Sequence, residues 1–352
     1  MICLFSIQAW AQSGKLFNTD NQLSSNFATQ VFQDKSGFIW IATRNGLNTY
    51  DGYHITVIKK DMSNFSGLNS NYINSIAQDE KEHILLGTNN SLLEFTGSEF
   101  LKIPMLDSKG GELATYVKQV YPLKNKDVAV ATSGYGIMLK KQDEQKCHAM
   151  KGEVEKLKYI LKLLEDKRGR LWIITEDGKL YRKETNGRLT SHFAGTEGVG
   201  AQDILQDALG NIYLASKNQG VYLLRAGSNA FTRISNIGNL PIENIYISRN
   251  NKLYIGCDGL GIYVYDPQTG FLQDNPLFSR LVNLAKSKIT SIIEDNQGNI
   301  WVSMLQKGVF MQRNIQNDFN YMGFRLGNLN VIGENCVTSL SINQGNQVWV
   351  GT

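Results

Sequence analysis

The fold is decided by a stretch near the start of the chain, residues 23–57, which reads LSSNFATQVFQDKSGFIWIATRNGLNTYDGYHITV. Its central segment FIWIAT is apolar on both faces of an extended chain, as expected of a strand inside a stacked sheet. Asp34 and Gly37 precede this segment and Gly46 follows it. These residues favour tight turns, because Asp bonds the turn backbone and Gly accepts a positive φ. The stretch therefore predicts short antiparallel strands joined by hairpins.

The same pattern recurs along the whole chain at intervals of 41 to 48 residues. Each repeat is anchored by a short apolar segment, and the eight segments are WIAT (from Trp40), LLGT (from Leu85), AVAT (from Ala129), WIIT (from Trp172), YLAS (from Tyr213), YIGC (from Tyr254), WVSM (from Trp301) and WVGT (from Trp349). The residues one before and one after each anchor residue, and those nine and twelve upstream, are apolar in all eight repeats. Such a period is the signature of a repeat architecture.

Each repeat reads as four short strands. An inner strand ends in a turn that carries Asp six residues before the anchor, as at Asp34, Asp166 and Asp295. The anchor strand follows, a Gly plus an aliphatic residue opens a third strand, and a more variable fourth strand ends the repeat. Four antiparallel strands in about 44 residues form one blade of a β-propeller. We therefore expect the anchor aromatics to pack between neighbouring blades.

Seven anchors have a complete repeat, while the eighth repeat stops at Thr352, before its outer strands. We therefore predict an all-β, seven-bladed β-propeller of four-stranded antiparallel blades over residues 12–325, and the first strands of a second propeller over residues 326–352. The segment Lys15–Asp20 is expected to close the ring by adding an outer strand to the blade of Trp301. An eight-bladed ring is the alternative, but its last blade lacks strands.

The first residues of the chain indicate export. The stretch Met1–Trp10 is apolar and ends in Ala9-Trp10-Ala11, which is similar to the end of a secretory signal peptide. We interpret residues 1–11 as a partial signal peptide and expect a periplasmic protein. The alternative is a buried N-terminal strand. Elsewhere the sequence holds no apolar run long enough to span a membrane.

Composition excludes several classes of function. The net charge of +4 comes without a basic block, so nucleic-acid binding is not expected. The four cysteines are scattered, without a CxxC pair, so we expect buried small hydrophobic residues rather than a zinc site or a disulfide framework. No pair of histidines has the spacing of metal ligands. We predict no catalytic residue, no metal and no cofactor.

The residues expected to bind a ligand lie in the loop that follows each anchor strand. A propeller gathers these loops around its central channel on one face. The candidates are Arg44, Asn45, Asn89, Tyr135, Glu176, Lys217, Asp258 and Gln306. Amides, charges and an aromatic ring suit a sugar, because each hydroxyl needs a donor or an acceptor. The alternative interpretation is that these loops are polar only because they face water.

The repeat resembles that of the two-component regulator propeller. The resemblance rests on the pattern D-x-x-G-x-[IL]-W-[IV]-[GA]-T-x-x-G-L, which residues 34–47 carry almost entirely. It extends over residues 12–352 and is weakest in the third repeat, where Ala129 replaces the aromatic anchor and Leu123 replaces Asp. The first repeat is similar to the start of the periplasmic sensor region in hybrid two-component systems of Bacteroidetes.

That resemblance implies a function in signalling. Members of the family place two propellers and a β-sandwich before a membrane helix, a histidine kinase, a receiver and a DNA-binding domain, and many sense oligosaccharides. No kinase or receiver motif occurs in these 352 residues. The chain is therefore expected to be a non-catalytic input domain for an oligosaccharide, to dimerise through the full-length protein and to reach the membrane only through a downstream segment. The alternatives are a free-standing propeller that acts as a sialidase-like hydrolase or lyase, and a protein-interaction scaffold.

Overall fold

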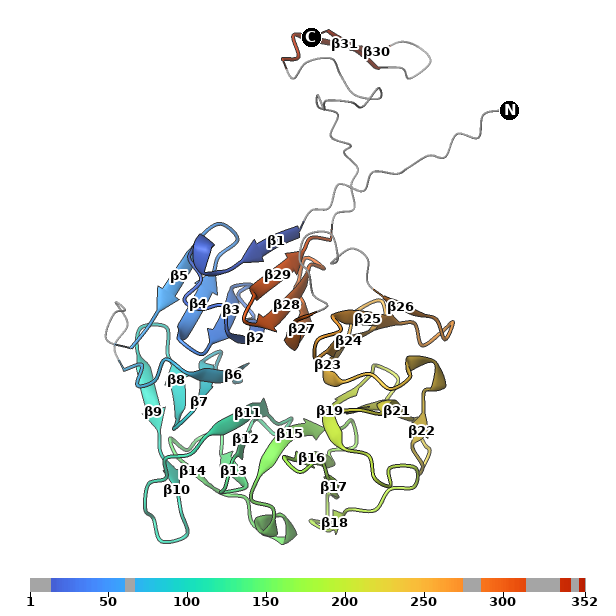
Figure 1. Ribbon diagram of the computed structural model, residues 1–352. Helices are drawn as coiled ribbons and strands as arrows, with labels where there is room; N and C mark the ends of the chain where they lie inside the picture. The colour runs from blue at the N-terminus through green and yellow to red at the C-terminus, as the bar shows by residue number, and fades with distance from the viewer. Residues whose placement is uncertain (1–13, 61–66, 275–285, 315–335, 343–347, 352) are drawn as a thin grey trace. The chain divides into compact units, whose positions relative to one another are not determined.

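The computed structural model describes residues 14–60, 67–274, 286–314, 336–342 and 348–351. Seven β-sheets follow one another around a central axis, each with its first strand innermost (Figure 1). This arrangement confirms the prediction of an all-β, seven-bladed propeller over the eight-bladed alternative. The segments predicted as a signal peptide, residues 1–11, and as the end of the propeller, near residue 325, lie outside the described residues.

The blades are numbered in chain order. Blades 1 to 3 contain β2 (Ala28–Gln33), β3 (Ile39–Thr43), β4 (Gly46–Tyr50) and β5 (Ile55–Ile58); β6 (Ile73–Gln78), β7 (Ile84–Thr88), β8 (Leu92–Phe95) and β9 (Phe100–Ile103); and β11 (Val117–Pro122), β12 (Val128–Thr132), β13 (Ile137–Lys140) and β14 (Cys147–Ala149), with β10 (Met105–Leu106) added.

Blades 4 to 7 repeat this order. They contain β15 (Ile160–Glu165), β16 (Leu171–Thr175), β17 (Leu180–Lys183) and β18 (Leu189–Thr190); β19 (Ala201–Gln206), β20 (Ile212–Ser216), β21 (Gly220–Leu224) and β22 (Thr232–Arg233); β23 (Ile242–Ile247), β24 (Leu253–Cys257), β25 (Ile262–Tyr265) and β26 (Leu272–Asp274); and β27 (Lys288–Glu294), β28 (Ile300–Leu305), β29 (Gly308–Gln312) and β1 (Gly14–Phe17). Three 3₁₀ turns, η1 (Thr19–Asn21), η2 (Glu153–Lys156) and η3 (Ser235–Ile237), lie in connections.

The ring closes through the N-terminal strand, as predicted. Strand β1 pairs antiparallel with β29 and supplies the outer strand of blade 7, although it ends at Phe17 rather than at Asp20. Phe17 is buried against Trp301, with 5.4 Å between the ring centroids, and against Tyr50 of blade 1, at 5.0 Å. One apolar residue therefore joins the first blade to the last.

A belt of polar side chains joins neighbouring blades near the axis. The pairing register of the inner strand in each of the seven blades shifts near its start, as between Ile73 and Ser75 in β6. In several blades an N–H just after this shift donates to a side chain of the preceding blade, for example from Ile76 to Gln30 Oε1 (2.8 Å) and from Leu163 to Gln119 Oε1 (2.7 Å). In these blades the bulged strand thus finds a hydrogen-bond partner in the preceding sheet.

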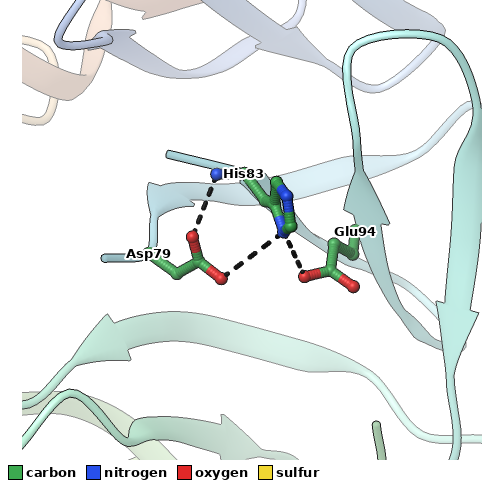
Figure 2. A group of neighbouring side chains, drawn as sticks. All are labelled: Asp79, His83 and Glu94. Atoms are coloured by element: carbon green, nitrogen blue, oxygen red, sulfur yellow. Dashed lines mark hydrogen bonds and ion pairs between the residues drawn. The ribbon is translucent and has the colours of Figure 1, made fainter. Parts of the chain in front are cut away.

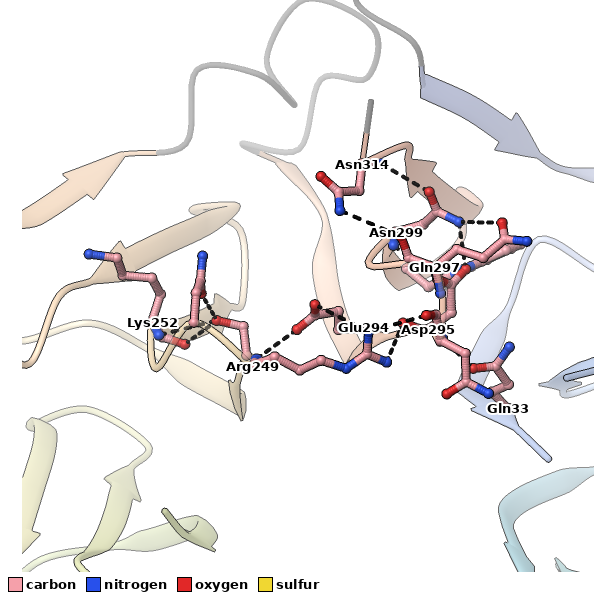
Figure 3. Close-up of polar contacts among 12 residues, drawn as sticks. Gln33, Arg249, Lys252, Glu294, Asp295, Gln297, Asn299 and Asn314 are labelled. Carbon is pink, nitrogen blue, oxygen red and sulfur yellow. Dashed lines mark hydrogen bonds and ion pairs between the residues drawn. The ribbon is translucent and has the colours of Figure 1, made fainter. Parts of the chain in front are cut away.

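The turns at the opposite ends of the inner strands form a second set of bridges between blades (Figure 3). The N–H of Asn296 in blade 7 donates to Gln33 Oε1 of blade 1 at 2.7 Å, which closes the ring at a second point. Arg249 of blade 6 reaches Glu294 with its N–H (2.8 Å) and the carbonyl of Asp295 with its guanidinium (2.6 Å). These turns therefore link blade 6 to blade 7 and blade 7 to blade 1.

The apolar cores lie between the blades. Trp40 of blade 1 packs with Ile76 and Leu86 of blade 2, Trp172 of blade 4 with Leu214 of blade 5, and Trp301 with Val31. The predicted packing role of these three anchors is confirmed. Trp349 differs, because its side chain is 65% exposed in the hairpin of β30 (Ser339–Ile342) and β31 (Val348–Gly351). That hairpin belongs to a separate compact unit, Ile315–Thr352.

Blade 3 departs from the expected four strands. Strand β10 pairs in parallel with the outer strand β14, so this sheet has five strands. Pro104 separates β9 from β10 and its carbonyl accepts the N–H of Cys147 at 2.8 Å. A proline has no N–H to give to a sheet, so it marks the point where the chain leaves one blade for the next.

Candidate functional site

The candidate ligand-binding residues lie in loops at one end of the blades. They occupy the loops between the second and third strands, and the first residue of each loop is bonded to the residue that precedes the inner strand. The N–H groups of Arg44, Asn89, Ser133, Glu176, Lys217 and Asp258 donate in this way to the carbonyls of Phe27, Tyr72, Tyr116, Tyr159, Gly200 and Pro241. Loop and inner strand are thus fixed to each other in six blades.

Four of the carbonyls that accept these bonds belong to aromatic residues that the sequence analysis did not single out. The residue thirteen positions before the anchor is aromatic in four consecutive blades, and we call this set the aromatic arc: Phe27, Tyr72, Tyr116 and Tyr159. In blades 5 to 7 the same position holds Gly200, Pro241 and Lys288. These aromatic residues recur at one position of the repeat, but that position lies outside the apolar core pattern on which the sequence prediction rests. The half of the ring that carries the arc therefore differs chemically from the other half.

Arg44 lies over the start of the arc. Its guanidinium carbon is 5.8 Å from the centroid of the Phe27 ring and 5.4 Å from that of Tyr72. Tyr72 in turn meets Tyr116 edge to face, with 6.0 Å between centroids. A guanidinium at this distance is attracted by the ring faces while its N–H groups stay available as donors.

Tyr116 and Glu176 continue the arrangement. The Tyr116 hydroxyl donates to Asn74 Oδ1 at 2.7 Å, and Lys118 Nζ lies 4.7 Å from the Tyr116 ring and 3.4 Å from Glu176 Oε1. Burial, with the nearby Tyr72 hydroxyl, raises the pKa of Tyr116. The phenol therefore stays protonated at neutral pH and keeps its proton for hydrogen bonding.

The other predicted residues contribute less to this arrangement. The side chain of Asn89 accepts a hydrogen bond from Ser70 at 2.8 Å, and its backbone N–H donates to the carbonyl of Tyr72. Asp258 lies outside the arc, with its Oδ2 3.4 Å from Lys288 Nζ. Asn45, Tyr135, Lys217 and Gln306 are exposed in their loops. The structure thus brings Arg44 and Glu176 into one chain of contacts and leaves the remaining candidates spread around the face.

The arrangement suits binding of a polar ligand with flat apolar faces. Aromatic rings offer area for stacking, and Arg44, Lys118 and Glu176 offer donors and an acceptor at their edges. Sugars combine a hydroxyl rim with an apolar C–H face, so both requirements are met by one site.

The cysteines and histidines occupy the following places. Cys147 and Cys257 are buried and unpaired, and burial raises the pKa of each thiol to about 12. Cys336 is exposed, and Cys3 lies outside the described residues. His54, His148 and His192 are exposed, whereas His83 is half-buried beside Asp79 and Glu94. Sequence spacing did not indicate this cluster, because Glu94 comes from a different strand.

The described part of the chain contains no helix long and apolar enough to cross a membrane. Together these features define the protein class: a seven-bladed β-propeller built from repeats of about 44 residues, with an aromatic face at one end. Two of its repeats, over residues 22–45 and 283–306, match the family described as two component regulator propeller. These two matches cover the two inner strands of blades 1 and 7. The resemblance seen in the sequence is thus confirmed.

Solved structures share this fold. An extracellular domain described as part of the hybrid two component system BT3049 from B. thetaiotaomicron has a TM-score of 0.74 and 22% identity, over 97% of this chain and 47% of that one. The corresponding domain of BT4673 gives 0.72 and 15%, over 96% and 46%. The chain thus spans about half the length of both relatives. A catalytically inactive virginiamycin B lyase from Staphylococcus aureus gives 0.65 and 13%, over 86% and 99%. A search of curated protein sequences found no match.

Proposed function

We propose that this propeller is the extracellular, ligand-sensing input domain of a hybrid two-component system, and that its ligand is an oligosaccharide bound on the aromatic arc. The repeat family and the fold of the BT3049 and BT4673 domains support the class. The observation that carries the ligand proposal is the contact chain Arg44–Tyr72–Tyr116–Lys118–Glu176.

The same proposal covers the position of the chain in a longer receptor. In the β30–β31 hairpin, Leu340 pairs with Val350 and Ser341 with Trp349, just as Val31 pairs with Ile41 and Phe32 with Trp40 in blade 1. The register and the exposed Trp349 support our proposal that this hairpin starts a second propeller. We also propose export to the periplasm, dimerisation of the full-length receptor and anchoring through a downstream segment.

A catalytic role is the alternative for a propeller of this size. The likeness to virginiamycin B lyase extends over nearly all of that enzyme, but at 13% identity it concerns the fold alone. The aromatic arc supplies stacking surfaces and fixed charges, which are the requirements of binding. We therefore propose that this chain recognises its ligand without transforming it.

Binding of defined oligosaccharides tests the ligand proposal. Isothermal titration calorimetry would use xylohexaose, mannohexaose and tetra-galacturonate as neutral and acidic probes. Tyr72→Ala and Tyr159→Ala are expected to weaken binding of whichever probe binds by about 5- to 30-fold, since stacking of one ring is worth about 1–2 kcal/mol. The matched control is Tyr53→Ala, because Tyr53 is 85% exposed in the β4–β5 loop, at the other end of blade 1.

The outcomes separate the parts of the proposal. Equal affinities in all three variants would place the ligand elsewhere and contradict the arc as the site. Absence of binding to every probe, with folded protein, would contradict an oligosaccharide site on this propeller. Release of a cleaved or eliminated product during the titration would contradict the non-catalytic role.

A further inference from the structure

We propose that blade 2 holds a divalent transition-metal ion, bound by Asp79, His83 and Glu94 at the end of the blade opposite the aromatic arc (Figure 2). Asp79 and His83 come from the turn between β6 and β7, and Glu94 from β8. Their ligand atoms all lie within 4.8 Å of one another. This site is independent of the proposed ligand-binding function.

The spacing within the cluster is compatible with a bound ion. His83 Nδ1 is 2.8 Å from Glu94 Oε1, within hydrogen-bond distance, and 3.8 Å from Asp79 Oδ2, beyond it. Zinc binds nitrogen and oxygen at about 2.0–2.2 Å, so two ligands of one tetrahedral ion lie about 3.3 Å apart. The two observed separations bracket that value, and small rotations of the side chains would equalise them.

Comparison with the other blades shows what is special about blade 2. In blades 4 and 7 the equivalent Asp Oδ2 accepts the indole N–H of Trp172 (2.9 Å) and of Trp301 (2.7 Å). It also accepts a side-chain donor four residues after the Asp, from Arg170 or Asn299. In blade 2 the anchor is Leu85, whose side chain has no N–H, and the residue four after the Asp is His83. A metal ion would take the place of the side-chain donors that Trp172 and Arg170, or Trp301 and Asn299, provide to the equivalent carboxylate.

Burial strengthens the argument. Glu94 faces the anchor position across the sheet, since it pairs with Leu85, and its exposed fraction is only 2%, against 6% for Asp79. Two buried carboxylates beside one imidazole need a compensating charge, because an uncompensated buried carboxylate is strongly unfavourable. A ligand set of one imidazole and two carboxylates suits Zn²⁺ or a similar first-row ion rather than Mg²⁺ or Ca²⁺. The backbone N–H of His83 already bonds Asp79 Oδ1 (2.9 Å) and holds that carboxylate in place.

The test uses the full chain, freed of metal with EDTA and of any histidine tag. We expect calorimetry with ZnCl₂ to show one ion per chain, and the melting temperature to rise with Zn²⁺ concentration. Glu94→Gln and His83→Gln should each weaken Zn²⁺ binding by at least about 10-fold. The matched control is His148→Gln, which alters an exposed histidine 3.8 Å from Glu144 and should leave affinity unchanged.

The absorption spectrum of Co²⁺ added to the wild-type protein provides a second measurement, which needs no variant. Visible bands of four- or five-coordinate Co²⁺, displaced by ZnCl₂, would support the site. A melting temperature that ZnCl₂ does not change would overturn the proposal and leave the three side chains as a group without an ion. Equal Zn²⁺ affinity in Glu94→Gln and wild type, or tighter binding of CaCl₂ than of ZnCl₂, would overturn it as well.

Discussion

Asp166 shows how one repeated residue organises a blade. Its Oδ1 accepts the turn N–H groups of Arg168 (2.9 Å) and Arg170 (3.0 Å), and its Oδ2 accepts the indole N–H of Trp172 (2.9 Å). The turn and the anchor strand are thereby fixed by one carboxylate. The spacing of six residues between Asp and anchor lets the indole reach back to the turn in this blade.

Trp172→Phe should therefore destabilise the propeller although the ring stays aromatic. The buried carboxylate loses a donor, so we expect the free energy of unfolding to fall by about 1–3 kcal/mol. Urea unfolding followed by circular dichroism measures this change. Trp349→Phe is the matched control, since Trp349 occupies the same repeat position but is exposed, and its effect should stay within about 0.5 kcal/mol. Equal effects at both positions would contradict the role of the indole.

The same carboxylate predicts a dependence of stability on pH. Burial alone would raise the pKa of Asp166, but hydrogen bonds from Trp172 and Arg170 outweigh it and hold the pKa below its ordinary value. The unfolded chain therefore takes up the proton at a higher pH, near 3.9, than the folded chain. The stabilising contribution is complete above about pH 5 and is lost as the pH falls through the folded pKa.

Asp166→Asn removes this dependence. The difference in unfolding free energy between wild type and Asp166→Asn should be largest at neutral pH and should shrink between about pH 5 and pH 2. Urea titrations at several pH values measure it. A difference that stays constant down to about pH 2 would show that Asp166 does not titrate with folding.

The buried thiols lead to a prediction of their reactivity. Because burial raises the pKa of Cys147 and Cys257 to about 12, neither forms appreciable thiolate at pH 8. In a Cys3→Ser background, Ellman's reagent should label one thiol, the exposed Cys336, in native protein and three in guanidinium chloride. Rapid labelling of three thiols without denaturant would contradict the burial of these two residues.

At the scale of elements, the sequence was sufficient for the strands that recur and insufficient for what differs between blades. The apolar positions around Trp40 and Trp301 predict the inner and anchor strands, because burial on both faces leaves a strong pattern. The latch of β1 was predicted because closure of the ring requires the first and last blades to meet. Strand β10 was not predicted, because a two-residue strand at the edge of a sheet produces no repeating pattern of apolar residues.

The candidate site was predicted only in outline for a related reason. Loop position alone indicates that Arg44 and Glu176 face the same end of the ring, but it says nothing of their contacts. The aromatic arc depends on which residue precedes each inner strand, a position outside the core pattern. The Asp79, His83 and Glu94 cluster depends on pairing of β7 with β8, which places Glu94 opposite Leu85.

The latch strand predicts a large effect from one residue far along the chain from its partners. Phe17 is 1% exposed and packs between Trp301 and Tyr50, so Phe17→Ala should lower the free energy of unfolding by about 3–5 kcal/mol. Denaturant unfolding measures this change. The control is Phe271→Ala, because Phe271 is exposed beside the outer strand of blade 6. Similar small effects in both variants would show that the latch does not hold the ring.

At the scale of the whole molecule, ring closure makes the seven blades one unit, whereas the β30–β31 hairpin belongs to another. The bonds that close the ring, from Asn296 to Gln33 and from Thr290 to the carbonyl of Ala28, all lie before residue 315. Removal of residues 315–352 should therefore leave the melting temperature of the propeller within about 2 °C of the full chain. Differential scanning calorimetry measures this. Removal of residues 1–17 is the matched comparison and should lower the melting temperature markedly, because it opens the edge of β29. A large loss of stability in the shorter C-terminal variant would show that the second unit supports the ring.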